Sequence, residues 1–395
     1  MVQEKLVSSE KTKNDNNVYH DEPQLQFDDN SLWEEYQFEE LFEIKNGLNK
    51  GKDYFGYGIP ILNYMDVNKN IYNTKESIKG LVDVDKNEIK RYNVKPNDLF
   101  FTRTSETSDE IGLTSAYTGE LMDCVFSGFI LRARPIKEDI NSLFFAYYLR
   151  SDKSRSNIIK YSSITTRALI SGSNLYKMKV RMPKIDEQNK IAGFLSAIDK
   201  KIELLEKKLV LCRKTIDFNV RKIYSDIEEY DEIKLNEIVK SYSSNLSINK
   251  LEENIGEYPL YGAEGIIKYV DFYEMKSPYI SIIKDGAGVG RLNLCNEFSS
   301  ALGTLQCLIP NQDININFLY FYLKTLNFNK YIVGSTIPHI YFKDYSKERI
   351  KVPSLKRQQD IGNYFSLYEK KNNMIKEEIE ILNKFKQGLL QKMFV

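Results

Sequence analysis

Two long stretches of the chain carry apolar residues at alternating spacings of four and three, the heptad pattern of a helix that packs against another helix. The first stretch runs from Ile191 to Ile223 and slips once near its end. The second runs from Ile361 to Met393 and keeps the pattern except for Asn372 and Lys386. Because each helix alone would leave an apolar stripe in water, we expect the two to pack together as an antiparallel pair.

A pair of helices inside one globular core is the alternative interpretation of these stretches. Their length counts against it, since Asp186 to Ile223 alone is 38 residues. The strongly charged positions outside the seam also favour a solvent-exposed coiled coil. Asn372 lies at a seam position, where a buried Asn can fix the register of two helices.

Outside the heptad stretches, the chain alternates short β-type runs with turns rich in Gly, Asn and Ser. Such runs are found at Asp98–Thr104 and Gly128–Arg134 in the first half, and at Pro278–Lys284 and Thr304–Pro310 in the second. Each half also contains one short apolar helix. The pattern predicts a compact α+β domain in each half.

The two halves repeat the same segments. Pro183 and Pro353 are 170 positions apart, and so are Gln188 and Gln358, just before each heptad stretch. Arg134–Ser151 and Ile309–Thr325 each read as a strand ending in Pro, an Asp-Ile-Asn turn and a short apolar helix. An internal repeat of this kind indicates that both halves share one plan.

These patterns predict an α+β fold of two α/β domains joined by a long antiparallel two-helix coiled coil. The predicted organisation is a flexible N-terminal lead-in (1–32), a first domain (33–183), a first spacer helix (184–228), a second domain (229–353) and a second spacer helix (354–395). Order is expected to begin near Trp33.

Composition adds few constraints. A hydrophobic content of 42% is ample for real cores, and the net charge of +1 neither favours nor excludes a polyanionic partner. With four cysteines in no CxxC spacing and only two histidines, a zinc site is not expected, and the cysteines are interpreted as buried thiols in a reducing cytoplasm. The N-terminus lacks the apolar core of a signal peptide, and no apolar run is long enough to span a membrane.

Positive charge is concentrated in the same place in each half. Leu149–Lys184 contains nine Lys or Arg against one acid, and Lys324–Lys356 contains seven against two. Two such segments in a neutral protein predict two electrostatic footprints for a nucleic acid. Basic helix ends and solvated faces are the alternative explanation.

The duplicated Pro-x-x-x-x-Gln and heptad signature resembles the DNA-specificity (HsdS) subunit of type I restriction-modification enzymes. The resemblance covers about Pro23 to Val395, and is supported by the segments Lys284–Leu292, Leu302–Pro310, Ser335–Tyr345 and Lys386–Phe394. It implies two target-recognition domains, each recognising one half of a split site in double-stranded DNA, and two helices that form the spacer.

The resemblance also implies partners. Two modification subunits would carry the adenine methylation, and restriction subunits could join them. S-adenosylmethionine, ATP and magnesium would then be bound by the partner subunits, and this chain would hold no cofactor of its own.

Candidate DNA-binding residues lie in small-polar or glycine-containing loops beside the basic segments. Hydroxyls and cations suit phosphate contacts, and Arg suits guanine. The candidates of the first domain are Arg103, Thr104, Thr165, Thr166 and Arg167, and those of the second are Tyr261, Lys284, Arg291, Ser335, Thr336 and His339. Ordinary surface loops are the alternative for each.

An enzymatic function is weakly supported. Asp285–Gly290 superficially resembles the glycine motif of S-adenosylmethionine-dependent methyltransferases, but the next residues alternate apolar and polar, which predicts a hairpin and not a cofactor-binding helix. The chain has no Pro-Pro dipeptide and no P-loop. A self-contained methyltransferase or nuclease is therefore not expected, whereas a coiled-coil scaffold whose end domains bind protein or carbohydrate remains an alternative to DNA recognition.

Overall fold

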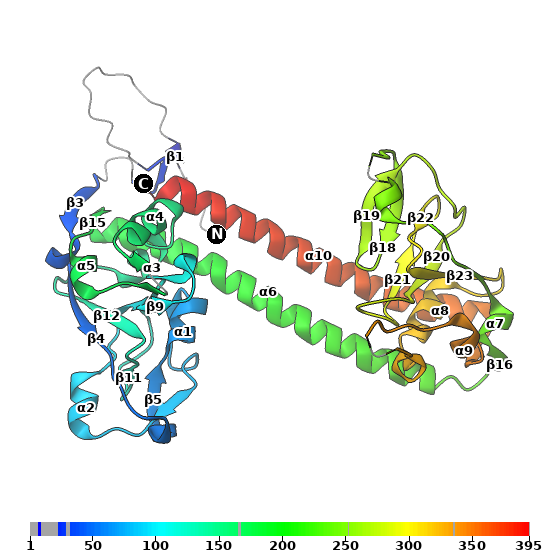
Figure 1. Ribbon diagram of the computed structural model, residues 1–395, viewed down its shortest axis with the longest axis horizontal. Helices are drawn as coiled ribbons and strands as arrows, with labels where there is room; N and C mark the ends of the chain where they lie inside the picture. Colours follow the sequence, from blue (N-terminus) through cyan, green and yellow to red (C-terminus); the bar gives the residue numbers. More distant parts are fainter. Residues whose placement is uncertain are drawn as a thin grey trace, which may run out of the picture. The chain divides into compact units, whose positions relative to one another are not determined.

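The computed structural model describes residues 7–8, 23–28, 32–164, 167–251, 253–334 and 336–394. The chain divides into two compact units: Met1–Leu204 with Ile379–Val395 form unit 1, and Leu205–Glu378 form unit 2. Helices α6 (Ile185–Ser225) and α10 (Leu355–Met393) each contribute residues to both units (Figure 1). Each unit therefore contains one part of each long helix.

A five-stranded sheet forms the core of unit 1, with the strand order β4-β12-β8-β10-β6. The strands are β4 (Phe42–Asn46), β6 (Tyr72–Asn73), β8 (Leu99–Thr102), β10 (Thr114–Tyr117) and β12 (Ile130–Pro135). Its neighbours are antiparallel except β10 and β6. Helix α3 (Ser142–Tyr148), nearly all buried, packs against β8 and β10.

Smaller elements surround this sheet. A second sheet has the order β11-β5-β7, formed by β11 (Val125–Phe126), β5 (Phe55–Leu62) and β7 (Gly80–Val82). Two further pairs are β3 (Glu34–Gln37) with β15 (Lys179–Met182) and β1 (Val7–Ser8) with β2 (Leu25–Gln26). The short helices are α1 (Tyr64–Lys69), α2 (Lys86–Arg91), α4 (Asp152–Lys160) and α5 (Gly172–Tyr176), with 3₁₀ helices η1 (Phe38–Glu40), η2 (Lys52–Tyr54) and η3 (Ser108–Glu110).

Unit 2 is built on the same plan. Its central sheet has the order β17-β23-β20-β21, formed by β17 (Val239–Tyr242), β23 (Leu305–Pro310), β20 (Tyr279–Ile283) and β21 (Leu292–Cys295). Its second sheet has the order β19-β18-β22, formed by β19 (Gly265–Val270), β18 (Tyr258–Gly262) and β22 (Ser300–Ala301). Strand β16 (Asp231–Lys234) pairs with β24 (Arg349–Val352) as β3 does with β15. The helices are α7 (Leu235–Ile238), α8 (Ile316–Leu323), α9 (Phe342–Tyr345), η4 (Ile248–Leu251) and η5 (Phe328–Tyr331).

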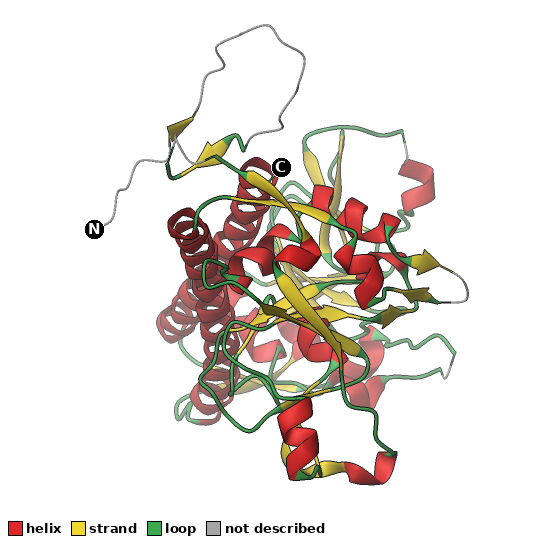
Figure 2. Cartoon of the chain, turned by 90° about the vertical axis from the view of Figure 1, so that its left-hand side faces the viewer, coloured by secondary structure: helices red, strands yellow, loops and turns green. Residues whose placement is uncertain are grey.

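The mixture of strands and short helices confirms the predicted α+β fold class (Figure 2). The second sheets of the two units agree even in strand direction, because β5 pairs in parallel with β11 and β18 pairs in parallel with β22. The internal repeat seen in the sequence is therefore a repeat of topology.

The Pro-x-x-x-x-Gln motif fastens each long helix to its unit. Gln188 is fully buried at the start of α6, and its Oε1 accepts a hydrogen bond from the backbone N–H of Asn141 at 2.9 Å. Its Nε2 donates to the carbonyls of Asp139 at 3.1 Å and Pro183 at 2.9 Å. Asn141 in turn caps the N-terminus of α3 with its side chain. One glutamine therefore joins the helix, the turn and the strand end.

The second copy makes the same three bonds in unit 2. Gln358 accepts from the backbone N–H of Asn315 at 2.8 Å and donates to the carbonyls of Asp313 at 3.2 Å and Pro353 at 2.9 Å. Asn315 caps α8 as Asn141 caps α3. The motif occurs twice because each copy binds the Asp-Ile-Asn turn of its own unit.

The two long helices are antiparallel, as predicted. In unit 1 the first part of α6 shares a hydrophobic core with the last part of α10. In unit 2 the last part of α6 shares a core with the first part of α10. Most of the residues that the two helices contribute to these cores belong to the heptad seam.

The polar seam positions of α10 differ from each other. Lys386 forms an ion pair with Asp199 of α6, whose other oxygen accepts from the hydroxyl of Tyr147 at 2.6 Å. Burial, together with the nearby Asp199 carboxylate, raises the pKa of Tyr147. Asn372 is buried, and its side-chain oxygen has no hydrogen-bond partner among the described residues. The charge of Lys386 is thus balanced by the Asp199 carboxylate. The unpaired side-chain oxygen of Asn372, in contrast, lowers the stability of the helix pair.

Part of the N-terminal lead-in packs on the fold. The backbone N–H of Phe27 donates to Oε1 of Glu187 at 2.6 Å, and its ring meets Phe194 edge-on at 5.7 Å. The backbone N–H of Gln24 donates to the carbonyl of Lys392 at 2.8 Å. Contacts with the fold therefore begin before Trp33. The sequence pattern could not predict them, because these bonds join segments that lie far apart in the chain.

Gln358→Ala should lower the free energy of unfolding of unit 2 by about 2–4 kcal/mol, because a buried side chain loses three hydrogen bonds together and their partners are left unpaired. Gln359→Ala is the matched control, since that neighbouring glutamine is exposed and should change stability by less than about 0.5 kcal/mol. Urea unfolding of both variants measures the difference, and equal shifts would show that the junction does not depend on Gln358.

Candidate nucleic-acid interface

A three-stranded sheet in unit 1 brings two of the predicted loops together. Strands β13 (Ser163–Ile164) and β14 (Ala168–Leu169) form a hairpin, and β14 also pairs with β9 (Thr104–Ser105) in the order β13-β14-β9. The loop containing Arg103 and the loop containing Arg167 are 64 positions apart in the sequence but lie on one small sheet. Thr165 and Thr166, at the tip of this hairpin, lie outside the described residues.

The candidate residues of this sheet differ in exposure. Arg167 projects from the hairpin with 71% of its side chain exposed, at 3.9 Å from the carboxylate of Glu106. Arg103 is half-buried, and its guanidinium donates to the carbonyl of Gly128 at 3.3 Å. Thr104 pairs directly with Leu169. Of the two cations, Arg167 is therefore the more accessible.

Exposed apolar side chains on and beside the hairpin were not singled out in the sequence. Ile164 is 57% exposed and Leu169 is 39% exposed on the hairpin itself. Phe129, whose carbonyl accepts from the backbone N–H of Arg103, is 66% exposed. In the sequence, each of them is only an isolated apolar residue in a polar loop. Such residues also occur singly on ordinary protein surfaces, so the sequence does not mark them as functional.

Unit 2 carries the equivalent hairpin. His339 pairs with Val333 on one side and with Asp285 on the other, each through antiparallel bridges. Thr336 lies exposed in the intervening loop, and Ser335 lies outside the described residues. Nδ1 of His339 is 2.6 Å from Oδ1 of Asp285. The predicted glycine loop and the predicted His339 loop therefore meet in one place.

The two predicted cations of unit 2 lie at the two ends of a closed loop. The backbone N–H of Ile283 donates to the carbonyl of Arg291 at 2.9 Å, which closes the loop that contains the glycines. The ammonium of Lys284 donates to the hydroxyl of Ser243. Arg291 is exposed.

Tyr261 is buried, whereas a side chain that contacts DNA must be exposed. Its side chain is only 5% exposed, and its ring packs in a hydrophobic cluster with Tyr279. Its hydroxyl accepts a hydrogen bond from the backbone N–H of Asn296 at 3.2 Å, and burial raises its pKa. The tyrosine is therefore a core residue of unit 2, and the sequence-based assignment is corrected.

Much of the positive charge in the basic segment of unit 1 serves the fold. Arg150 donates to the carbonyls of Thr114 and Val67, and burial lowers the pKa of its guanidinium to about 10. Arg155 donates to the carbonyl of Ile111.

Ion pairs neutralise part of the basic segment of unit 2. Three of its cations form ion pairs, namely Lys324 with Glu369, Lys330 with Glu348, and Arg349 with Glu232. The charge counts of both segments therefore overstate the free positive surface, and the candidate interface rests on the hairpins.

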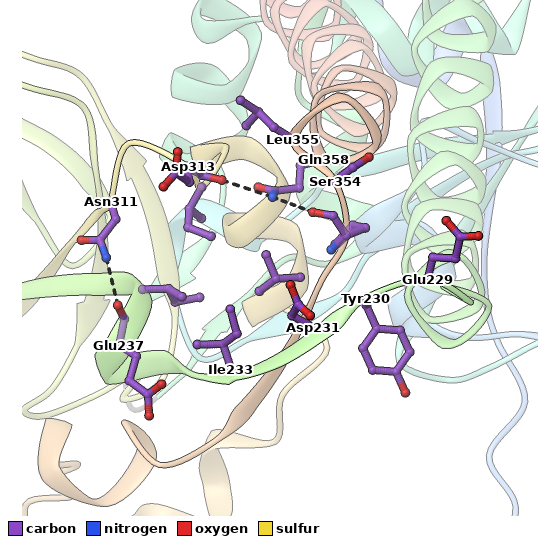
Figure 3. A pocket seen from close by; sticks show the side chains of 14 residues that line it. Glu229, Tyr230, Asp231, Ile233, Glu237, Asn311, Asp313, Ser354, Leu355 and Gln358 are labelled. Atoms are coloured by element: carbon purple, nitrogen blue, oxygen red, sulfur yellow. Dashed lines mark hydrogen bonds between the residues drawn. The ribbon is translucent and has the colours of Figure 1, made fainter.

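A cavity of about 760 Å³ opens in unit 2 beside the Gln358 junction (Figure 3). Its walls include the carboxylates of Glu229, Asp231, Glu237 and Asp313, with no Lys or Arg among the described residues that line it. A polyanion would be repelled from such a cavity. It is therefore not part of the candidate nucleic-acid interface.

The cysteines are free thiols, with Cys124, Cys295 and Cys307 buried and Cys212 half-buried. Burial raises the pKa of Cys124 and of Cys307 to about 12, which disfavours the reactive thiolate. Within the described ranges, no three His, Cys, Asp or Glu side chains are grouped so that they could hold a metal ion. No helix in the described part of the chain is long and apolar enough to cross a membrane.

Comparison with known proteins gives the family. The model of the type I restriction modification DNA specificity domain matches residues 30–211 and 227–384. The chain belongs to this family. A relative from Mycoplasma genitalium, described as a type I specificity subunit, is 25% identical over 405 residues, which cover 94% of this chain and 96% of the relative. Another from Mycoplasma pneumoniae is 24% identical over 282 residues, covering 67% of this chain and 75% of the relative.

Solved structures share the fold. The crystal structure of the S subunit of a type I restriction-modification system from M. genitalium matches with a TM-score of 0.66 and 21% identity, covering 95% of this chain and 99% of that one. A structure described in terms of type I complex assembly matches with a TM-score of 0.53 at 15% identity, covering 92% of this chain and 97% of that one. The specificity subunit is the DNA-recognition component of its system and is non-catalytic.

The glycine motif of the specificity subunit lies in a hairpin between two strands. Strands β20 and β21, on either side of the motif, pair antiparallel, so the predicted hairpin is confirmed. Gly286, Gly288 and Gly290 have φ of 88°, 87° and 84°, a backbone conformation that other residues rarely adopt. Because a strand and not a helix follows the glycines, the motif lacks the helix N-terminus that a methyltransferase uses to hold its cofactor.

Proposed function

We propose that this specificity subunit recognises a bipartite site in double-stranded DNA, one half through the hairpin of each unit. The observation that carries the proposal is that one scaffold occurs twice, with the same glutamine junction, and presents different side chains at its hairpins. Two copies of one binding surface with different side chains suit two different half-sites.

The hairpin residues have the chemistry that DNA recognition needs. Arg167 and Arg291 are exposed cations that can contact phosphates or guanine edges. Thr336 supplies a hydroxyl for phosphate contacts, and Ile164 and Leu169 can contact thymine methyl groups. Family membership favours this function over a scaffold that binds protein or carbohydrate.

We further propose that the long helices set the unrecognised gap between the half-sites. Helix α6 has 41 residues and α10 has 39, so each is about 60 Å long. A continuous helix is stiff on this scale and fixes a distance better than a flexible linker does.

The outer faces of the same helices are suited to the modification subunits. Leu211 and Phe218 of α6 are one heptad apart and each 65% exposed, while Leu367 and Met374 of α10 are one heptad apart and 68% and 61% exposed. Exposed apolar rows on an otherwise polar helix are typical of a protein contact. One row on each helix suits two modification subunits, which would carry the methylation, with restriction subunits joining that complex. We expect the complex to act in the cytoplasm, where it meets DNA.

Removing one heptad from each helix should shorten the gap. Deletion of Ile202–Lys208 from α6 and Ile375–Ile381 from α10 shortens both helices by about 10 Å, keeps the seam in phase and leaves the four row residues in place. At about 3.4 Å per base pair, the gap should lose about three base pairs, while both half-site sequences stay the same. Methylome sequencing of cells that express the variant with its modification subunits gives the motif.

Deletion from α6 alone is the control, since it throws the seam out of register and should abolish methylation. Some loss of activity is also expected from the double deletion, because each heptad rotates the ends of a straight helix by about 20°. An unchanged gap with full activity would exclude the helices as the ruler.

Charged substitutions on the apolar rows should each remove one modification subunit. Leu211→Glu with Phe218→Glu on α6, or Leu367→Glu with Met374→Glu on α10, places carboxylates in an apolar contact, which is costly when a charge is buried unpaired. Mass photometry should show one modification subunit per specificity subunit in place of two.

Lys214→Glu with Arg221→Glu is the matched control, because these exposed residues of α6 have the same spacing but lie off the row. This variant should keep the wild-type stoichiometry. If all of these variants bind two modification subunits, the partners dock elsewhere on the chain.

A further inference from the structure

One cross-strand pair occupies the same place in both hairpins. In unit 1, Leu169 pairs with Thr104, and the backbone N–H of Ile170 donates to the carbonyl of Arg103 at 3.0 Å. In unit 2, His339 pairs with Asp285, and the backbone N–H of Ile340 donates to the carbonyl of Lys284 at 2.9 Å. The pairs Thr104–Leu169 and Asp285–His339 are therefore structurally equivalent.

The chemistry at this position differs between the units. Leu169, 39% exposed, offers only an apolar surface. His339 and Asp285 are each 35% exposed at the side chain, and their nitrogen and oxygen are 2.6 Å apart. A histidine at this place can form a directional hydrogen bond with a ligand, whereas a leucine cannot.

The carboxylate decides which atoms of the histidine are available. An ionised carboxylate can only accept hydrogen bonds, so Nδ1 of His339 carries a hydrogen and donates the hydrogen bond that Asp285 accepts. In the neutral ring, Nε2 is then a hydrogen-bond acceptor. No described residue forms a hydrogen bond with Nε2, so this atom is available to a ligand.

The backbone holds this arrangement in place. The N–H of His339 donates to the carbonyl of Val333 at 2.8 Å, and the N–H of Val333 donates back to His339 at 2.9 Å. The N–H of Gly286 donates to the carbonyl of Pro338 at 3.0 Å, which ties the loop of Asp285 to the loop of His339. Little conformational freedom remains to be lost when a ligand binds.

We propose that His339 is a specificity-determining residue that accepts a hydrogen bond from the exocyclic amino group of an adenine or cytosine in the half-site of unit 2, and that Asp285 is its positioning residue. The inference rests on the proposed function and names the chemistry of one base contact. In the major groove, the amino groups of adenine and cytosine are the donors that distinguish them from thymine and guanine. At the equivalent place in unit 1, Leu169 suits a thymine methyl group.

The test begins with the methylated motif of the wild-type complex with its modification subunits. Each adenine or cytosine of both half-sites is then replaced in turn by an analogue that lacks the amino group, and the affinity of the complex is measured. Removal of one amino group should weaken wild-type binding by about 5- to 150-fold, the cost of one lost base contact. The His339→Ala complex should bind the natural site that much more weakly and should not respond to the analogue at that position.

Two variants separate positioning from folding. Asp285→Ala leaves the imidazole in place but frees its orientation, so it should also lose most of the response to the analogue. Asp285→Asn should keep the response, because the amide oxygen can still accept a hydrogen bond from Nδ1–H. Leu169→Ala is the matched control and should relax only the other half-site. If His339→Ala fails to fold, judged by thermal unfolding, Asp285→Ala supplies the same comparison.

The outcomes distinguish this inference from the proposed function. A wild-type complex that methylates no bipartite motif would overturn the proposed function and this inference with it. A bipartite motif for which both variants weaken all sequences equally, or for which their response to every analogue matches that of the wild type, would overturn this inference alone.

Discussion

A single buried glutamine in each unit joins the long helix to the body of that unit. Gln188 and Gln358 each bind the turn that begins a buried helix and the strand end that precedes a long helix. A buried amide that loses these partners pays the full cost of desolvation, so the geometry is fixed within a narrow range. The junction therefore fixes each long helix to the turn and the buried helix of its own unit.

This constraint separates the scaffold from the surface that varies. The sheets, the capped helix and the glutamine junction agree between the units, whereas the equivalent pairs Thr104–Leu169 and Asp285–His339 do not. The pairs are half-exposed and contribute little to either core, so their side chains can change without loss of the fold. A chain built in this way can hold two different recognition surfaces on one architecture.

The elements that depend on local pattern could be predicted from the sequence. The heptad seams, the duplicated Gln motif and the hairpin after the glycines all follow from spacing, and the structure confirms them. The union of the Arg103 and Arg167 loops on one sheet could not be predicted, because it depends on pairing between distant strands. Tertiary contacts were the other source of error. Tyr261 has a residue type common at DNA interfaces but is buried, and the half-buried Arg150 donates its hydrogen bonds to backbone carbonyls of the fold.

The central claim, that two equivalent units each recognise one half-site, is tested most directly by a chain that carries the second domain twice. Residues 33–183 would be replaced by residues 229–353, so that Gln188 and Gln358 both hold the same domain. The chain would be expressed with its modification subunits, and the methylated motif would be determined. The account predicts a motif in which the half-site of unit 2 occurs on both sides of an unchanged gap. A motif that retains the original half-site of unit 1 would contradict it.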